Sequence, residues 1–197
     1  MSENRLQFVE DGHKFILDGS IELPSVTTLL KECGVIDTAF YTNAGADNGK
    51  RRHLITELMD KGTLDWGSVA DEDFAYAQGW AEFCKDYQFE ATHIEQPMFH
   101  EYFMYAGIAD RLGVSGEDRV PTIVDLKTGS KLERWVELQL LLYAMMVDSE
   151  TPPKLIAVHL RPGKSANYRA KEFGYDSLDV AQSIIKISAW KRRIGNE

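Results

Sequence analysis

Residues 107–144 read GIADRLGVSGEDRVPTIVDLKTGSKLERWVELQLLLYA, and they decide the fold and the chemistry expected of the chain. The run PTIVDLK is typical of a strand and carries Asp125 and Lys127 two residues apart. Side chains two apart in a strand project from the same face, so this acid and this amine are expected to meet. A hairpin through Gly113–Gly116 would bring Asp110 beside them from a neighbouring strand. Two carboxylates and a lysine in one place are the parts of a Mg²⁺- or Mn²⁺-dependent phosphodiester hydrolase.

The position of Asp125 strengthens this hypothesis. The residue lies inside the apolar run TIVDL, where an unpaired charge would cost several kcal/mol. A bound cation removes that cost. Taken alone, each aspartate would more readily be interpreted as a solvated residue at a strand end or sheet edge.

A helix-like segment follows the strand and carries Gln139 and Tyr143 one turn apart. Residues four apart share a helix face, so both polar groups could reach a phosphate or a base. Gln139 stands among leucines, where its amide needs hydrogen-bond partners, while Tyr143 could also be an ordinary core residue. Trp135, one turn before Gln139, could stack on a base, but core packing is the favoured interpretation.

In their order these motifs resemble the PD-(D/E)XK nuclease superfamily, and within it the RecB-like and Cas4-like branch and the phage-type exonucleases. A G-x-x-D motif is matched by Gly107–Asp110, D-x-K by Asp125–Lys127, and Q-x-x-x-Y by Gln139–Tyr143. Upstream, Gly49–His53 matches G-x-x-x-H, and Glu95 in IEQPMF stands where an acidic residue often precedes the first aspartate. Each motif alone is weak, whereas five in order are specific, and they cover residues 49–143.

The resemblance implies a role for each of these residues. The implied metal ligands are His53, Asp110, Asp125, the backbone carbonyl of Leu126 and, less firmly, Glu95. Lys127 would orient the attacking water and stabilise charge on the phosphate, and Gln139, Tyr143, Arg52 and Lys50 would contact DNA. An imidazole ligand favours Mn²⁺. Glu57 would accept a hydrogen bond from His53, although His53 and Glu57 could also be a purely structural pair one turn apart.

The implied fold is an α/β (α+β) restriction-endonuclease-like core, with a mixed central β-sheet flanked by helices. The chain reads as one domain, residues 1–197, with an N-terminal hairpin and helix arm at 1–47 and a catalytic core at 48–197. The expected elements are a hairpin at 6–17 around Asp11-Gly12, helices from Ser25 to Gly34 and at 48–60, 71–89, 133–147 and 177–193, and strands at 93–100, 102–111, 121–127 and 154–161.

Composition sets further bounds. The net charge of −9 argues against a long duplex-binding groove, but the basic clusters at 50–52 and 191–193 leave a compact DNA channel feasible. Cys33 and Cys84 are too few for a four-cysteine iron–sulfur cluster and are expected to be reduced, buried thiols. The sequence shows neither signal-peptide character nor a membrane-spanning run, so a cytoplasmic location is expected.

The leading hypothesis is therefore a metal-dependent DNA exonuclease acting on single- or double-stranded ends. The resemblance places such enzymes in recombination, repair or phage replication, with a recombinase or strand-annealing protein as partner. A non-catalytic DNA-end or protein-binding module on the same fold is one alternative, favoured by the acidic charge. A structure- or sequence-specific endonuclease is the other.

Overall fold

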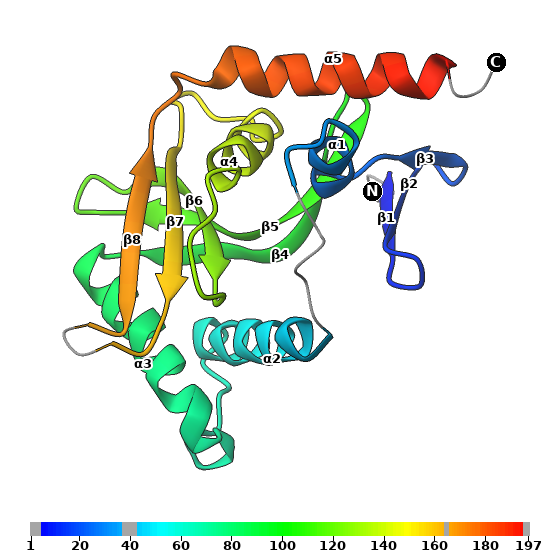
Figure 1. Cartoon of the computed structure of the whole chain (residues 1–197). Helices are drawn as coiled ribbons and strands as arrows, with labels where there is room; N and C mark the ends of the chain where they lie inside the picture. The colour runs from blue at the N-terminus through cyan, green and yellow to red at the C-terminus, as the bar shows by residue number, and fades with distance from the viewer. Residues whose placement is uncertain (1–4, 37–42, 164–165, 195–197) are drawn as a thin grey trace.

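A computed structural model describes residues 5–36, 43–163 and 166–194 of the chain (Figure 1). The strands are β1 (Leu6–Val9), β2 (Lys14–Leu17), β3 (Ile21–Leu23), β4 (Glu90–His100), β5 (Tyr105–Ser115), β6 (Val120–Lys127), β7 (Lys154–Leu160) and β8 (Tyr168–Phe173). The helices are α1 (Val26–Glu32), α2 (Asn43–Asp60), α3 (Asp71–Asp86), α4 (Val136–Ala144) and α5 (Leu178–Ile194), with a 3₁₀ turn at Trp66–Ser68.

The strands form two sheets. The small sheet is antiparallel in the order β1-β2-β3, and the large one has the order β4-β5-β6-β7-β8. Within the large sheet only the β6–β7 pair is parallel, and α4 provides the crossover that a parallel pair requires. The large sheet is therefore mixed, with β6 at its centre.

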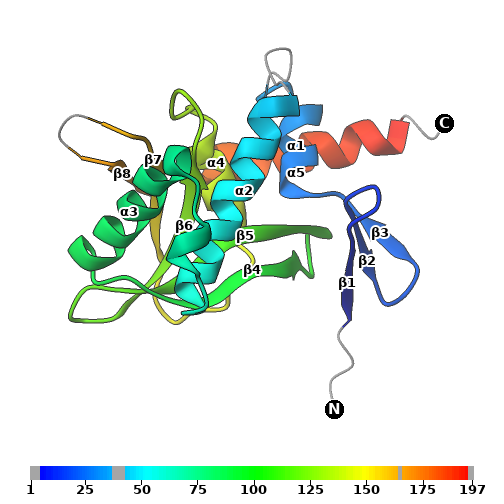
Figure 2. The same cartoon turned by 90° about the horizontal axis from the view of Figure 1, so that it is seen from below.

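Helices cover both faces of the large sheet. On one face α1, α4 and α5 pack over a core that includes Leu140, Leu155 and Ile184, all almost fully buried. On the other face Trp80 and Phe83 of α3 pack against the outward residues of β6 and β7. Seen from below, α2 lies between α3 and the small sheet (Figure 2). The predicted fold class, a mixed sheet flanked by helices with an N-terminal hairpin, is confirmed.

Several local predictions are also confirmed. The hairpin turns at Asp11-Gly12, where Gly12 has the left-handed φ of +78°. Ser25 caps α1, because its side chain accepts a hydrogen bond from the backbone N–H of Thr28 at 3.0 Å. Short-range signals of this kind depend only on residues that are close in sequence.

The path of β5 differs from the prediction. The expected hairpin at Gly113–Gly116 falls partly inside the strand, which continues to Ser115 before the turn. Gly113 pairs with Ala91 on one side and Thr122 on the other. A Cβ at this position would lie 2.2 Å from the backbone oxygen of Glu90, so glycine here permits a close strand approach rather than a turn. Asp110 consequently lies in mid-strand.

Other boundaries need correction as well. β8 was not predicted, because Arg169, Lys171 and Glu172 are exposed on this edge strand and make its sequence look like a polar loop. The three-residue β3 was also missed. α2 begins at Asn43, so the expected arm boundary at residue 47 falls within a helix. α3 ends at Asp86 instead of residue 89, since Gln88 takes a left-handed φ of +46°. α4 is shorter at both ends than the predicted 133–147.

Among the described residues, no helix combines the length and the apolar character that crossing a lipid bilayer would require. The predicted strand at 93–100 begins earlier, at Glu90, and the helix at 177–193 is confirmed to within one residue at each end.

The contact between α2 and the large sheet depends on Arg111, whose side chain is fully buried. It pairs with Asp60 of α2 at 2.5 Å, and Asp60 also accepts a hydrogen bond from Trp80 of α3 at 2.8 Å. We expect Arg111→Leu to lower the free energy of unfolding by about 3–5 kcal/mol, because it leaves a buried carboxylate without its cation. Denaturant unfolding measures this difference.

Arg119→Leu is the matched control. Arg119 forms a 2.9 Å pair with Glu90 at the surface, where both side chains are more than half exposed. This change should cost less than about 1 kcal/mol. Equal losses from the two variants would contradict the structural role assigned to Arg111.

Candidate active site

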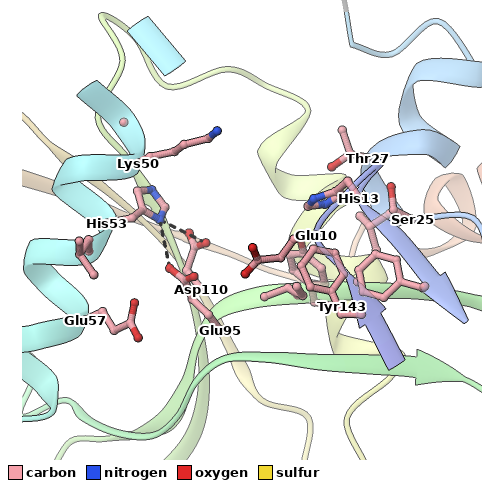
Figure 3. A pocket seen from close by; sticks show the side chains of 17 residues that line it. Glu10, His13, Ser25, Thr27, Lys50, His53, Glu57, Glu95, Asp110 and Tyr143 are labelled. Carbon is pink, nitrogen blue, oxygen red and sulfur yellow. Dashed lines mark ion pairs between the residues drawn. The ribbon is translucent and has the colours of Figure 1, made fainter. Parts of the chain in front are cut away.

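Three metal-ligating side chains converge at the edge of a pocket between α2, β4 and β5. Nδ1 of His53 lies 3.6 Å from Oδ1 of Asp110 and 3.8 Å from Oε1 of Glu95 (Figure 3). One ligand atom from each residue lies within 4.8 Å of those of the other two. A single divalent cation could therefore be held by all three side chains after small adjustments.

The backbone at Glu95 is unusual for a strand residue. Ile94 pairs with Arg111 and Gln96 pairs with Ala109, so Glu95 stands opposite Asp110 in the register. Its φ is +47°, in the left-handed region that residues other than glycine, asparagine and aspartate seldom adopt. Such strain costs about 1–3 kcal/mol and persists where the surroundings enforce it, often at functional sites. Here it accompanies a carboxylate aimed at His53.

Asp110 links this triad to the central strand. Its Oδ2 atom accepts a 2.6 Å hydrogen bond from the backbone N–H of Leu126, while Oδ1 faces His53. Because β5 and β6 pair as Arg111 with Val124, Asp110 and Asp125 lie side by side on adjacent strands. The two aspartates predicted from the sequence are thus brought together, with one hydrogen-bonded to the strand of the other.

Asp125 is 1% exposed and lies next to Lys127, as the D-x-K spacing predicts. The Lys127 ammonium is 2.6 Å from Oδ2 of Asp125, but this ion pair lacks hydrogen-bond geometry, and no other donor among the described residues reaches that oxygen. Burial raises the pKa of Asp125 to about 6; the charge of Lys127 opposes this shift and that of Asp110 adds to it. Beside this one ammonium, the buried carboxylate keeps oxygen lone pairs that a cation could bind.

A chain of polar contacts fixes Lys127. Its ammonium donates to Oε1 of Gln139 at 3.2 Å, and Nε2 of Gln139 donates to the Tyr143 hydroxyl at 3.1 Å. The ring of Trp135 lies 5.3 Å from the same ammonium, within cation–π range. The helix residues predicted to contact DNA thus contact the lysine and each other, and Tyr143 also lines the pocket (Figure 3).

Gly107 of the G-x-x-D motif makes this arrangement possible. A Cβ at Gly107 would lie 2.8 Å from the Tyr143 ring and 3.0 Å from Val26. Only glycine leaves room for α1, α4 and β5 to meet this closely. Burial raises the pKa of Tyr143, and the nearby Asp125 adds to that shift, so its hydroxyl stays protonated.

Arg111 is a residue of this site that the sequence did not predict. Its Nη1 donates to the backbone oxygen of Asp110 at 2.7 Å and lies 3.9 Å from Oε1 of Glu95. Its Nη2 donates to Thr56 of α2 at 3.0 Å. One buried guanidinium thus contacts the strand of Asp110, the carboxylate of Glu95 and the helix that carries His53. Its place directly after Asp110 in the sequence could have drawn attention to it. Its partners on α2, Thr56 and Asp60, are more than fifty residues away in the sequence and could not have been foreseen.

Two predicted residues have other surroundings than expected. Glu57 pairs with Lys61, one turn along α2, and not with His53, which faces the two acids. Arg52 is held by Asp73 at 2.9 Å and stacks on the Tyr76 ring at 3.6 Å, so it joins α2 to α3.

Of the basic cluster predicted at residues 50–52, Lys50 lines the pocket. It is exposed, and its side chain extends from α2 toward the opposite wall (Figure 3). Arg51, its neighbour in sequence, pairs with Glu72 at 2.5 Å and with buried Asp73. The basic cluster predicted at 50–52 is thus largely neutralised.

The cysteines lie on different elements, Cys33 at the end of α1 and Cys84 in α3, and both are free thiols that are partly buried. Burial raises the pKa of Cys84 to about 12, so it is not a thiolate at neutral pH. Neither belongs to the group of ligand atoms around His53.

Comparison with known proteins identifies the family of the chain. Residues 39–194, most of the chain, match the PD-(D/E)XK nuclease superfamily. The chain belongs to this superfamily. Its fold is similar to the crystal structure of a candidate exonuclease from Eubacterium rectale, with a TM-score of 0.51 and 10% identity over 86% of this chain and 73% of that one. None of the curated proteins matches the chain.

The superfamily and its fold support an enzyme that cleaves phosphodiester bonds in nucleic acid. Proteins of this superfamily use divalent metals, and the donors present here fit such an ion. Carboxylate oxygens with one imidazole suit Mg²⁺ and Mn²⁺, and Asp125 lies on the strand next to that of Asp110.

The burial of Asp125 should make the free energy of unfolding depend on pH. Because its pKa is raised to about 6 in the folded chain, the folded state keeps a proton that the unfolded chain loses near pH 4. Without metal, the free energy of unfolding should fall as pH rises between about 4 and 6. Asp125→Asn should therefore stabilise the protein in EDTA at pH 7.5 by about 1–3 kcal/mol, and hardly at all at pH 4.

Denaturant unfolding at the two pH values measures the effect. Asp118→Asn, in the exposed β5–β6 turn, is the control and should change stability by under about 0.5 kcal/mol. An Asp125→Asn protein that is less stable than the parent in EDTA at pH 7.5 would refute the prediction.

Proposed function

We propose that the chain is a divalent-metal-dependent DNA exonuclease, with His53, Glu95, Asp110 and Asp125 at its metal site and Lys127 as its catalytic lysine. The observation that supports it most is the single constellation formed by His53, Glu95 and Asp110 with the buried Asp125–Lys127 pair. The candidate exonuclease that shares the fold supports the exonuclease mode. The chain is proposed to work as one domain, residues 1–197.

The proposed ion is Mg²⁺ or Mn²⁺. Bound among these carboxylates, it would supply an acidified water and neutralise charge on the phosphate. The backbone carbonyl of Leu126 remains a proposed further ligand. Burial lowers the pKa of His53, but the nearby Asp110 and Glu95 raise it more, so the pKa lies above its usual value. His53 must therefore lose a proton before its imidazole can bind the ion. Binding should thus strengthen as His53 loses its proton.

The lysine supplies a fixed positive charge. Its ammonium is held between Oδ2 of Asp125 and Oε1 of Gln139, so it can donate a hydrogen bond to the attacking water or to a phosphate oxygen without first being ordered. Asp125 beside it can accept a hydrogen bond from the same water. Gln139 and Tyr143 act as positioning residues, since the structure connects them to Lys127.

Cleavage of end-labelled DNA tests the proposal directly. With Mg²⁺ or Mn²⁺ the parent protein should release mononucleotides or short oligomers from linear DNA, and EDTA should stop it. Lys127→Ala and Asp125→Ala should each lower the rate by at least about a hundredfold, because each removes a group that acts in the transition state. Lys131→Ala, an exposed lysine paired with Glu133, should cleave as the parent does.

The outcomes separate the candidate functions. Cleavage of closed circular DNA would point to an endonuclease. Absence of cleavage by the parent with every ion, while DNA still binds, would favour a non-catalytic DNA-binding module. Full activity in both variants would show that the site residues are misassigned.

The role of Gln139 can be tested separately. Gln139→Leu removes the acceptor of Lys127 but should leave the packing of α4 intact, since the helix is otherwise apolar. A hydrogen bond to a charged group is worth about 1.5–3 kcal/mol, so we expect kcat to fall about 10- to 100-fold. KM for DNA should change little if Gln139 positions Lys127, and rise if Gln139 binds DNA. Gln182→Leu on α5 is the control.

A further inference from the structure

The pocket that contains the proposed metal site has a second wall, formed by the β1–β2 hairpin. The cavity has a volume of about 720 Å³ and reaches from His53 and Asp110 to Phe8, His13 and Phe15 of that hairpin. Figure 3 shows the acids and His53 on one side and His13 on the other. A wall of this kind shapes what can approach the metal site.

Aromatic rings dominate this wall. The rings of Phe8 and His13 pack edge to face with centroids 4.8 Å apart, and Phe8 lies 5.0 Å from Phe15. Phe15 is buried and anchors the group, whereas Phe8 is half-buried and His13 is exposed. Phe8 and His13 therefore offer ring surface to the pocket that no side chain among the described residues fully covers.

The charges of the pocket divide it into two halves. Lys50 and the cation proposed at His53, Glu95 and Asp110 can neutralise a phosphate on the α2 side. On the hairpin side Glu10 directs its carboxylate toward Asp110 (Figure 3), so this wall repels phosphate. An uncharged ring fits the hairpin side, and a phosphate fits the other.

We infer that the β1–β2 hairpin holds the nucleobase next to the scissile phosphate, by stacking on Phe8 and His13, so that the site takes an unpaired nucleotide. This inference rests on the nuclease function proposed above. A base inside a duplex is covered on both faces by its neighbours, so it can stack here only in single-stranded DNA or at a frayed end. The hairpin thereby selects single strands.

The backbone conformation of His13 allows its ring to be removed without strain. Its φ is +52°, a left-handed conformation that glycine adopts without strain, so His13→Gly removes the ring without disturbing the turn. Phe8→Leu keeps the apolar packing on Phe15 but removes a ring face. Tyr102→Ala is the control, because Tyr102 is an 83% exposed ring at the β4–β5 turn, outside the pocket lining.

The experiment measures fluorescence anisotropy of a labelled twelve-nucleotide oligothymidylate and of a blunt duplex, with Mg²⁺, in the Lys127→Ala background. We expect the oligothymidylate to bind more tightly than the duplex, and His13→Gly and Phe8→Leu each to weaken its binding about 5- to 30-fold. Tyr102→Ala should have no effect. Thermal melting checks that each variant is folded.

The results distinguish this inference from the proposed function. If the parent cleaves DNA but both hairpin variants bind the oligothymidylate as tightly as the control, the nuclease stands and the hairpin inference is overturned. Equal affinity for the duplex overturns it too. If the parent never cleaves but binding of the single strand depends on Phe8 and His13, the hairpin site stands and the nuclease proposal fails.

Discussion

The structure depends on keeping several carboxylates close together at the centre of a sheet. Asp110 and Asp125 are neighbours on adjacent strands, and burial already raises the pKa of Asp125 to about 6. Two positive groups offset this repulsion: Lys127 lies 2.6 Å from Asp125, and Arg111 binds the strand of Asp110. Without them the sheet would not tolerate two acids here. These two positive groups do not neutralise all the carboxylates around the site. The remaining negative charge suits a site that binds a cation.

The same constraint explains the packing around the site. Lys127 can offset Asp125 only if its flexible side chain is held, and α4 does this through Gln139. That contact requires α4 to lie directly on the strands, which in turn requires glycine at Gly107 beneath Tyr143. The motifs that are separate in sequence are therefore parts of one arrangement. The helix motif supports the lysine of the strand motif, and the glycine of the first motif makes room for the helix.

The sequence predicted what depends on short-range geometry and missed what depends on long-range contacts. The spacing of Asp125 and Lys127 follows from the two-residue period of a strand, and the cap at Ser25 from a local hydrogen bond. By contrast, the ion pair of Arg52 with Asp73 could not be predicted, because Asp73 lies on another helix. The contact of Arg111 with Asp60 was hidden for the same reason. The edge strand β8 is mostly polar, so its sequence lacks the apolar pattern by which a strand is predicted.

The acidic net charge of −9 is consistent with a nuclease once the uses of its basic residues are known. Three of its arginines form ion pairs with buried or nearly buried carboxylates and therefore add little positive potential at the surface. They are Arg51, Arg52 and Arg111. Such a charge disfavours holding a duplex through many phosphate contacts, which is how basic nucleic-acid-binding surfaces gain most of their affinity. In the proposed function, recognition would come from a few local contacts: a cation among the acids, Lys50 at the pocket, and aromatic rings that bind a base irrespective of its sequence. Such contacts need an accessible, unpaired nucleotide, so the charge of the chain and the shape of its pocket favour the same substrate.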